Sequence, residues 1–307
     1  MISVGIMARE QKWARTLEHL IREDDFSISG WINPVAQAQS DIDQLIDRSS
    51  LIWIPEKLNG DMTEAVQVLR KSKHLLLGFP VVDFVEEAFH LLKLTREAEV
   101  KVQVGHQERY LPAIRSIIPF LDHPQAVYVK HYTTLSGITE TPPWFLQEMV
   151  SDLGLILPIL QGPEKRVKVH VSLSRNHLPV TIDIRIEFHN GALAKLQYRP
   201  MTEKPKRTIE VIQPDDIIEI DLISETSVRQ KLPLESGDRL PREILWEPPG
   251  NRSVGSLNNS LHFDDQITQC ISFLQALKKD HQPVFPLEEG FHALEIARQI
   301  QSQITSY

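Results

Sequence analysis

The first 105 residues alternate short apolar runs with amphipathic segments, and this alternation constrains the fold most. The apolar runs are strand-length, end at proline, glycine or charge, and lie at residues 2–7, 26–32, 50–54, 74–77 and 100–104. The segments between them repeat apolar residues every three or four positions and predict helices at 13–22, 41–47, 61–71 and 85–98. Such alternation is typical of parallel strands with helices on both faces. We therefore predict a doubly wound α/β sheet.

The pattern changes after residue 124, where strands follow one another with few helices. Strands are predicted at 126–134, 167–174, 181–188, 192–198, 208–213 and 217–222. Asn190-Gly191 is a strong hairpin signal between two of them. One helix at 144–160 covers this sheet, residues 231–259 are predicted as irregular loops, and helices at 263–278 and 287–304 end the chain. The second part is therefore predicted to be an α+β domain with a large, mostly antiparallel open sheet.

Charge and composition exclude several classes of function. The net charge of -8 and pI of about 5.9 do not suit a generic nucleic-acid binder, which must attract phosphate. The basic stretches at 165–168 and 204–207 are predicted as a strand with a solvated face and a solvated turn. Cys270 is the one cysteine and is predicted to be a buried hydrophobe.

Targeting, membrane and metal signals are not found. Residues 2–7 form a strand rather than a signal peptide, and no apolar run approaches the roughly 20 residues of a membrane span. The expected compartment is the cytoplasm, without a membrane partner. The twelve histidines show no metal-ligand spacing, so no metal site is expected.

Five local segments, at 75–88, 102–113, 151–154, 188–194 and 283–297, form a recognisable series. Together, and in this order over nearly the whole chain, they resemble the Gfo/Idh/MocA family of nicotinamide-dependent sugar and polyol oxidoreductases. The resemblance implies a Rossmann-like domain at 1–120 and a sheet domain at 121–285. It also implies that a helix at 286–307 packs back on the first domain. It further implies a cofactor, NAD or NADP, and a homo-oligomer, a dimer or tetramer formed through the second-domain sheet.

The phosphate-binding loop of such a domain requires G-x-G-x-x-G, so that backbone amides can approach the pyrophosphate. Aligned from Gly5, the chain keeps only the first glycine. Met7 then lies at the close-approach position and Glu10 at the third glycine, while Arg9 is a candidate phosphate partner. An ordinary turn that binds no dinucleotide is the alternative interpretation.

Two further cofactor positions are altered. Asn33 lies where an acidic residue usually binds the adenosine ribose, and it is a weaker acceptor or simply a turn residue. Pro55 matches the family's pattern after the third strand, but Glu56 and Lys57 do not and are predicted to be solvated charges.

The resemblance makes the catalytic positions decisive. The family's lysine, in Glu-Lys-Pro beside the nicotinamide, is replaced by Phe79 before Pro80. The histidine of Asp-x-Gly-x-His is replaced by Ile156, and the following acidic position by Ile159. None of the three can transfer a proton, which is worth about 10²–10⁴-fold per group.

A few polar residues remain as weak catalytic candidates. His106 follows the fifth strand and has either a structural or a titrating role, and Gln107 is a candidate neighbour of the nicotinamide. Arg109 either ties two elements together or holds an anion. Asp152 either caps the central helix or faces the cleft, and Tyr132 is a possible relocated group.

Three hypotheses follow. The first is a catalytically diverged or inactive homologue that binds a small molecule or protein partner in the interdomain cleft, with or without a cofactor. The second is an active NAD(P)-dependent oxidoreductase on a sugar, polyol or related molecule, with relocated catalytic residues. The third is an enzyme for a cofactor-free reaction.

Overall fold

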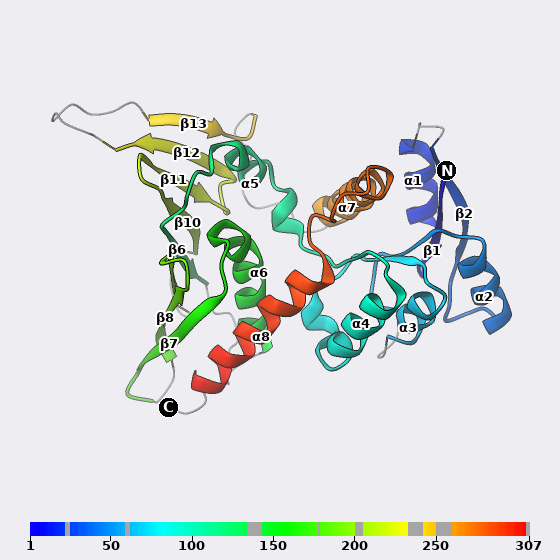
Figure 1. The fold of residues 1–307 in the computed structure, drawn as a ribbon, viewed down its shortest axis with the longest axis horizontal. Coiled ribbons are helices and arrows are strands. Elements are labelled where there is room, and N and C mark those ends of the chain that lie inside the picture. Colours follow the sequence, from blue (N-terminus) through cyan, green and yellow to red (C-terminus); the bar gives the residue numbers. More distant parts are fainter. Residues whose placement is uncertain are drawn as a thin grey trace. The chain divides into compact units, whose positions relative to one another are not determined.

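The computed structural model forms two compact units, each built around one sheet (Figure 1). Unit 1 contains Met1–Tyr110 and Leu257–Leu294, and unit 2 contains Leu111–Ser256 and Glu295–Tyr307. The structure describes residues 1–21, 25–58, 62–133, 143–176, 179–199, 205–232, 242–249 and 260–304.

The sheet of unit 1 is parallel throughout and has the strand order β2-β1-β3-β4-β5. Its strands are β1 (Ile2–Met7), β2 (Phe26–Ile32), β3 (Leu51–Ile54), β4 (His74–Leu77) and β5 (Val102–Gln103). This order reverses direction between β1 and β3, as in doubly wound folds, where ligands bind beyond the carboxyl ends of the strands. The predicted doubly wound sheet is confirmed.

Helices cover both faces of this sheet. One face packs against α1 (Lys12–Leu20) and α7 (Ser260–Lys278), and Leu17 and Phe273 are fully buried in that core. On the other face, Leu45 of α2 (Gln39–Asp47) lies against Gly5. Right-handed crossovers put two more helices on the α2 face, α3 (Thr63–Arg70) and α4 (Val85–Ala98).

The sheet of unit 2 has the strand order β13-β12-β11-β10-β6-β9-β8-β7. All its pairings are antiparallel except that of β6 with β9. The strands are β6 (Ala126–Tyr132), β7 (Glu164–Leu173), β8 (Pro179–Phe188), β9 (Leu193–Arg199), β10 (Lys206–Ile212), β11 (Asp216–Asp221), β12 (Thr226–Lys231) and β13 (Arg242–Trp246). The predicted large, mostly antiparallel sheet is confirmed.

Two helices pack on the sheet of unit 2. The long helix α6 (Pro143–Leu160) contacts β6 and β9, while the short helix α5 (Pro112–Ile117) contacts β11, β12 and β13. The last helix, α8 (Leu287–Ile304), begins in unit 1 and ends in unit 2. Short 3₁₀ segments lie at Val81–Phe84, Gln107–Tyr110 and Ile118–Phe120.

The predicted irregular region at 231–259 is partly wrong, because it contains β13. This strand lies at the sheet edge with largely exposed side chains, so its sequence lacks the alternation that marks half-buried strands. Residues 233–241 and 250–259 of that region lie outside the described residues. The expected domain at 121–285 included the residues of α7, whereas α7 packs in the core of unit 1. The domain boundaries at 120 and 285 remain predictions.

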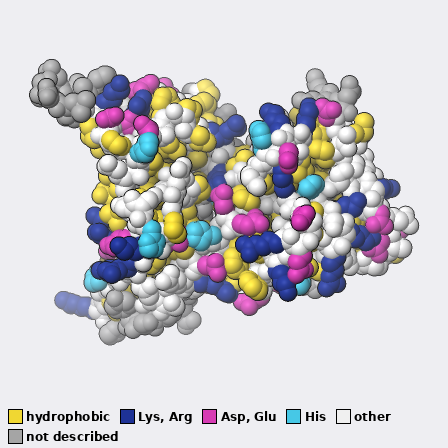
Figure 2. All heavy atoms as spheres, viewed as in Figure 1, with side chains coloured by type: hydrophobic (Ala, Val, Ile, Leu, Met, Phe, Trp, Pro, Cys, Tyr) yellow, Lys and Arg dark blue, Asp and Glu magenta, His cyan; other side chains and the backbone are white. Residues whose placement is uncertain are grey.

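The surface shows no dominance of one charge sign on the visible face. Figure 2 shows acidic and basic side chains interspersed over both units. Among the described helices, none combines the length and hydrophobicity that a bilayer crossing requires.

Candidate functional site

The turn after β1 is where a dinucleotide pyrophosphate would bind in a fold of this kind. Because β1 ends at Met7 and α1 begins at Lys12, this turn consists of residues 8–11, which include no glycine. Gly5 and Met7 both lie inside β1 and are buried. The predicted loop alignment therefore started too early, since the strand continues two residues past Gly5.

Gly5 has a packing role in the structure. A Cβ atom at this position would lie 2.5 Å from Ser49 Oγ and 2.7 Å from Ile52 Cδ1. The missing side chain lets the segment that follows α2 lie directly against β1. Gly5, which suggested a phosphate-binding loop, thus allows close packing between the sheet and its helix layer.

The same turn is bonded to the loop after β3. The backbone N–H of Arg9 donates to Glu56 Oε1 at 3.0 Å, and the guanidinium Nη2 donates to the Leu58 carbonyl at 2.6 Å. A carboxylate of the chain therefore accepts an amide hydrogen of the kind that phosphate oxygens accept in dinucleotide sites. Glu56 was predicted to be a solvated charge, and its half-buried side chain makes this contact at the protein surface.

The other predicted cofactor residues are used in local structure. Asn33 Oδ1 accepts the N–H of Val35 at 3.1 Å, which is an Asx turn. Pro55 is buried, Pro80 is half-buried, and Gln107 lies in the 3₁₀ segment after β5. Lys57, predicted to be solvated, donates to the Asp83 carbonyl.

The side chain at the family's lysine position is buried in an apolar environment. Phe79 is 7% exposed, and its ring meets that of Phe84 edge to face with centroids 5.8 Å apart. Leu58 and Met62 line a small space beside it, together with Lys57 and Glu64. The Phe79 side chain itself therefore offers no proton donor at that position.

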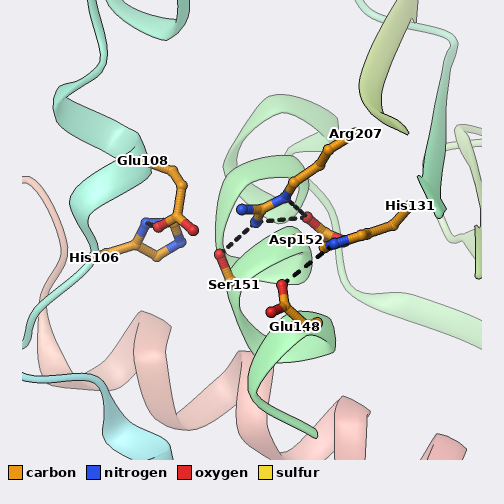
Figure 3. Close-up of polar contacts among 7 residues, drawn as sticks. All are labelled: His106, Glu108, His131, Glu148, Ser151, Asp152 and Arg207. Carbon is orange, nitrogen blue, oxygen red and sulfur yellow. Dashed lines mark hydrogen bonds and ion pairs between the residues drawn. The ribbon is translucent and has the colours of Figure 1, made fainter. Parts of the chain in front are cut away.

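His106 and Arg109 follow β5 in unit 1. His106 is 5% exposed, its Nδ1 lies 3.3 Å from Glu108 Oε2 (Figure 3), and its ring meets the Phe285 ring at 4.6 Å. Arg109 donates to Glu289 Oε2 at 2.7 Å and lies over the same Phe285 ring. Arg109 thus ties this turn to the segment before and within α8, which confirms the first of its two predicted roles.

The residues of unit 1 do not fit a nicotinamide dinucleotide of the usual binding mode. The turn lacks glycines, and Glu56 puts negative charge on the amide of Arg9. The side-chain oxygen of Asn33 is already occupied, because it accepts the N–H of Val35 within its own turn. A phosphate would therefore meet the Glu56 carboxylate and an amide that is already hydrogen-bonded, instead of free N–H donors. The ribose hydroxyls would meet Asn33, whose side-chain acceptor is occupied, instead of a carboxylate.

Unit 2 contains a buried polar cluster between its sheet and α6 (Figure 3). Arg207, His131 and Tyr198 are cross-strand partners on β10, β6 and β9, so they form one row facing the helix. The next row on the same face, two residues along each strand, is apolar and consists of Ile209, Val129 and Leu196. The row thus marks where the hydrophobic interior of unit 2 gives way to polar groups.

Asp152 is the centre of this cluster. Its Oδ2 lies 2.7 Å from His131 Nδ1, while its Oδ1 accepts from Arg207 Nε at 3.0 Å and Nη2 at 2.9 Å. Arg207 Nη2 also donates to Ser151 Oγ at 2.7 Å, and Glu148 Oε2 lies 3.4 Å from His131 Nε2. The imidazole therefore lies between two carboxylates.

Burial and charge act in opposite directions here. Complete burial by itself would raise the pKa of Asp152, but Arg207 and His131 hold that pKa below its ordinary value. Burial, together with the nearby Asp152 carboxylate, raises the pKa of Tyr198, which stacks on His131. The cluster thus holds an ionised carboxylate beside a neutral phenol.

These contacts settle several sequence predictions. Asp152 lies inside α6 and does not cap it. Arg207 was predicted in a solvated turn but belongs to β10 and binds Asp152; Lys204 lies outside the described residues. Ile156, at the family's histidine position, is fully buried. Sequence reasoning missed His131, although its position two residues after Val129 in β6 predicts that it faces inward.

Tyr132 cannot join this cluster. Its neighbour His131 faces α6, so Tyr132 projects from the opposite face of the sheet, where it donates to Gln197 Oε1 and lies under Arg199. The two weak candidates of unit 2, Tyr132 and Asp152, therefore cannot form one catalytic site.

No protein-family model matches this chain, and no curated protein matches it significantly. Solved structures do match over nearly its full length. UDP-N-acetylglucosamine 3-dehydrogenase GnnA from Acidithiobacillus ferrooxidans is 15% identical, with a TM-score of 0.71 over 98% of this chain and 97% of that chain. An NAD binding oxidoreductase from Klebsiella pneumoniae is 12% identical, with a TM-score of 0.71 over 99% and 97%. Aldose-aldose oxidoreductase from Caulobacter crescentus is 14% identical, with a TM-score of 0.62 over 99% and 98%.

The chain has the fold of the Gfo/Idh/MocA oxidoreductases. The resemblance drawn from the sequence is confirmed at the level of the fold, with both sheets as expected. At 12–15% identity, the similarity to these solved structures shows a shared architecture only. Substrate and activity depend on the individual residues of the site.

Proposed function

We propose that this chain is a catalytically diverged Gfo/Idh/MocA-type protein that no longer performs nicotinamide-dependent hydride transfer and binds a small molecule or a protein partner. The observation that carries the proposal is the contact of Glu56 with the backbone N–H of Arg9. It joins the turn after β1 to the loop after β3 at the place where a diphosphate would need free donors.

The catalytic positions support the same proposal. Phe79 and Ile156 are buried aliphatic or aromatic groups where the resemblance implies a lysine and a histidine. Asp152, which matches the family's aspartate, is fully buried and bonded to Arg207 and His131. A proton-transfer apparatus of the family's kind is therefore incomplete in both units.

Calorimetric titration of the full chain with NADH and with NADPH tests the proposal. We expect no binding tighter than roughly 100 μM, which corresponds to about -5.5 kcal/mol. The Glu56→Gln variant removes the charge at the turn but supplies no glycines, so it is expected to stay below the same affinity. Micromolar binding of either coenzyme to the unmodified chain would contradict the proposal.

The alternative is an oxidoreductase on a sugar, polyol or related molecule with relocated catalytic groups. The observation that favours it is the His131 imidazole between Asp152 and Glu148, which is an acid–base group outside the segments that carry the resemblance. This alternative requires oxidation or reduction of a nicotinamide coenzyme in the presence of a sugar. Absorbance at the reduced-coenzyme band would reveal it, and loss of turnover in His131→Gln with coenzyme affinity unchanged would assign the role.

A further inference from the structure

Lys101, just before β5, links the sheet of unit 1 to the end of α7. Its Nζ lies 2.6 Å from Asp280 Oδ1 and donates to the His281 carbonyl at 2.9 Å, directly after the helix. Asp280 is exposed, and an ion pair with an exposed carboxylate contributes little stability by itself. The strength of this link therefore depends on how firmly the backbone of Lys101 is held.

Strand β4 binds both polar groups of the Lys101 backbone. The carbonyl of Lys101 accepts the N–H of Leu75 at 3.2 Å, and its N–H donates to the His74 imidazole Nδ1 at 3.0 Å. The ladder between β4 and β5 is short, because β5 has two residues. The His74 side chain thus adds a hydrogen bond beyond the end of a short ladder.

This hydrogen bond requires a neutral imidazole. A ring nitrogen accepts through its lone pair, whereas both ring nitrogens of a protonated histidine are donors. Nδ1 of His74 is therefore unprotonated while it accepts the N–H of Lys101, and the ring proton belongs on Nε2. A proton added to Nδ1 would leave the Lys101 amide without this acceptor and set two N–H groups against each other.

The surroundings of His74 disfavour its protonation. Burial is the main effect that lowers the pKa of His74 below its ordinary value, and the Lys101 ammonium adds to it. The Asp280 carboxylate acts in the opposite direction, and Asp280 in turn feels His281. Among the described residues, these are the charged and titratable groups that face the imidazole from β5 and from the segment after α7. Because an ordinary histidine has a pKa of about 6.5, the neutral form prevails at neutral pH.

We propose that His74 is an acid-sensitive clasp for the end of α7. The neutral imidazole fixes the Lys101 backbone, and with it the ammonium that binds Asp280 and the His281 carbonyl. Protonation releases the Lys101 amide and sets a second cation beside the ammonium, so the attachment of α7 loosens. The unfolded chain takes up this proton at about pH 6.5 and the folded chain at a lower pH, so the stabilisation is lost as the pH falls below about 6.5.

Hydrogen exchange of the full chain, read by mass spectrometry at about pH 7.5 and about pH 5, tests the clasp. After correction for the intrinsic exchange rate, the end of α7 and the segment around Lys101 are expected to lose protection by about fivefold at the lower pH. That factor is the net contribution of about one hydrogen bond. Helix α6 of unit 2 is the internal reference and is expected to keep its protection.

Two variants separate the acceptor from the proton. His74→Asn places a carbonyl oxygen close to the position of Nδ1 and does not titrate, so it is expected to keep the protection of α7 at both pH values. His74→Leu has no acceptor and is expected to give low protection at both. The matched control, His90→Asn, changes an exposed histidine of α4 and is expected to retain the pH dependence of the unmodified chain.

An NMR titration of the unmodified chain with isotope-labelled histidine tests the clasp without any variant. His74 is expected to be the Nε2–H tautomer at neutral pH and to titrate with a midpoint below about 6.5. A midpoint at or above that value would overturn the proposal. So would an equal loss of α7 protection on acidification in the unmodified chain and in His74→Asn. Neither measurement involves a nicotinamide coenzyme, so this proposal and the proposed function can fail separately.

Discussion

A single carboxylate organises the polar interior of unit 2. Asp152 has no exposed surface, and its two oxygens are shared between Arg207 and His131. A buried charge is tolerable only when its partners are present, because desolvation costs several kcal/mol. The energetic role of Asp152 is therefore best measured through those partners.

Replacing Arg207 is expected to destabilise the protein strongly. Arg207→Met leaves the buried carboxylate without its main counter-charge and is expected to cost about 3–5 kcal/mol. Adding Asp152→Leu removes the stranded charge, so the double variant is expected to recover much of that loss. Urea unfolding of the four proteins in this cycle provides the measurement. A double variant as unstable as the sum of its single changes would contradict the pairing.

The lowered pKa of Asp152 predicts a specific pH dependence. A carboxyl whose folded pKa lies below its unfolded value stabilises the fold above about pH 4, and this contribution is lost as the pH falls through the folded pKa. Asp152→Asn is therefore expected to be less stable at neutral pH and to lose less on acidification. Thermal unfolding between pH 7 and pH 2.5 tests this, and parallel acid limbs in the two proteins would exclude it.

At the scale of elements, periodicity predicted most of the fold. The predicted ranges of β2, β4, α4 and α8 agree with the structure at both ends. Alternation failed at β13, an edge strand whose side chains are mostly exposed. It also failed to place α7, because an amphipathic pattern identifies a buried face but not the sheet that covers it.

The candidate site was less predictable than the elements. The altered residues Phe79 and Ile156 were visible from the sequence because the family's motifs fix their positions. The contact of Glu56 with Arg9 was not, since it joins loops 47 positions apart. Arg207 was missed because the proline before it suggested a turn, although Arg207, Ile209 and Val211 alternate toward the same face.

The hairpin between β8 and β9 supports the end of α6. Asn190 Nδ2 donates to the Leu160 carbonyl at 2.7 Å, and Asn190 Oδ1 accepts the N–H of Ala192 at 3.0 Å. Asn190→Asp keeps the acceptor but replaces the donor with negative charge facing a helix carbonyl. We expect a loss of about 1–3 kcal/mol, measured by chemical denaturation. The milder control Asn190→Ser should have a stability between those of the unmodified protein and Asn190→Asp. An Asn190→Asp variant as stable as the unmodified protein would contradict the role of Asn190 at the end of α6.

At the scale of the whole molecule, the two units are interleaved along the chain. Unit 1 needs residues from both ends, because α7 supplies Cys270, Phe273 and Leu274 to the core that contains β1 and α1. Burial also raises the pKa of the Cys270 thiol, which agrees with its predicted role as a buried hydrophobe.

Phe273→Ala is therefore expected to destabilise unit 1 by about 3–5 kcal/mol, since the side chain is fully buried. The matched control is Phe89→Ala, because Phe89 is 67% exposed and its loss should change stability by less than about 0.5 kcal/mol. Near-ultraviolet circular dichroism reports on this core, because the rings of Trp13 and Trp53 meet edge to face at 5.6 Å. Equal effects of the two substitutions would contradict the assignment of α7 to this core.

The late arrival of α7 has a consequence for biosynthesis. The strands and helices of residues 1–110 leave the ribosome before α7, with the surface that α7 will cover still exposed to solvent or to chaperones. At about 5–20 residues per second, translation of the intervening segment and α7 takes roughly 10–30 s. The nascent chain must therefore shield an apolar surface while these residues are translated, and codon-dependent pausing within residues 111–278 should affect the yield of folded protein.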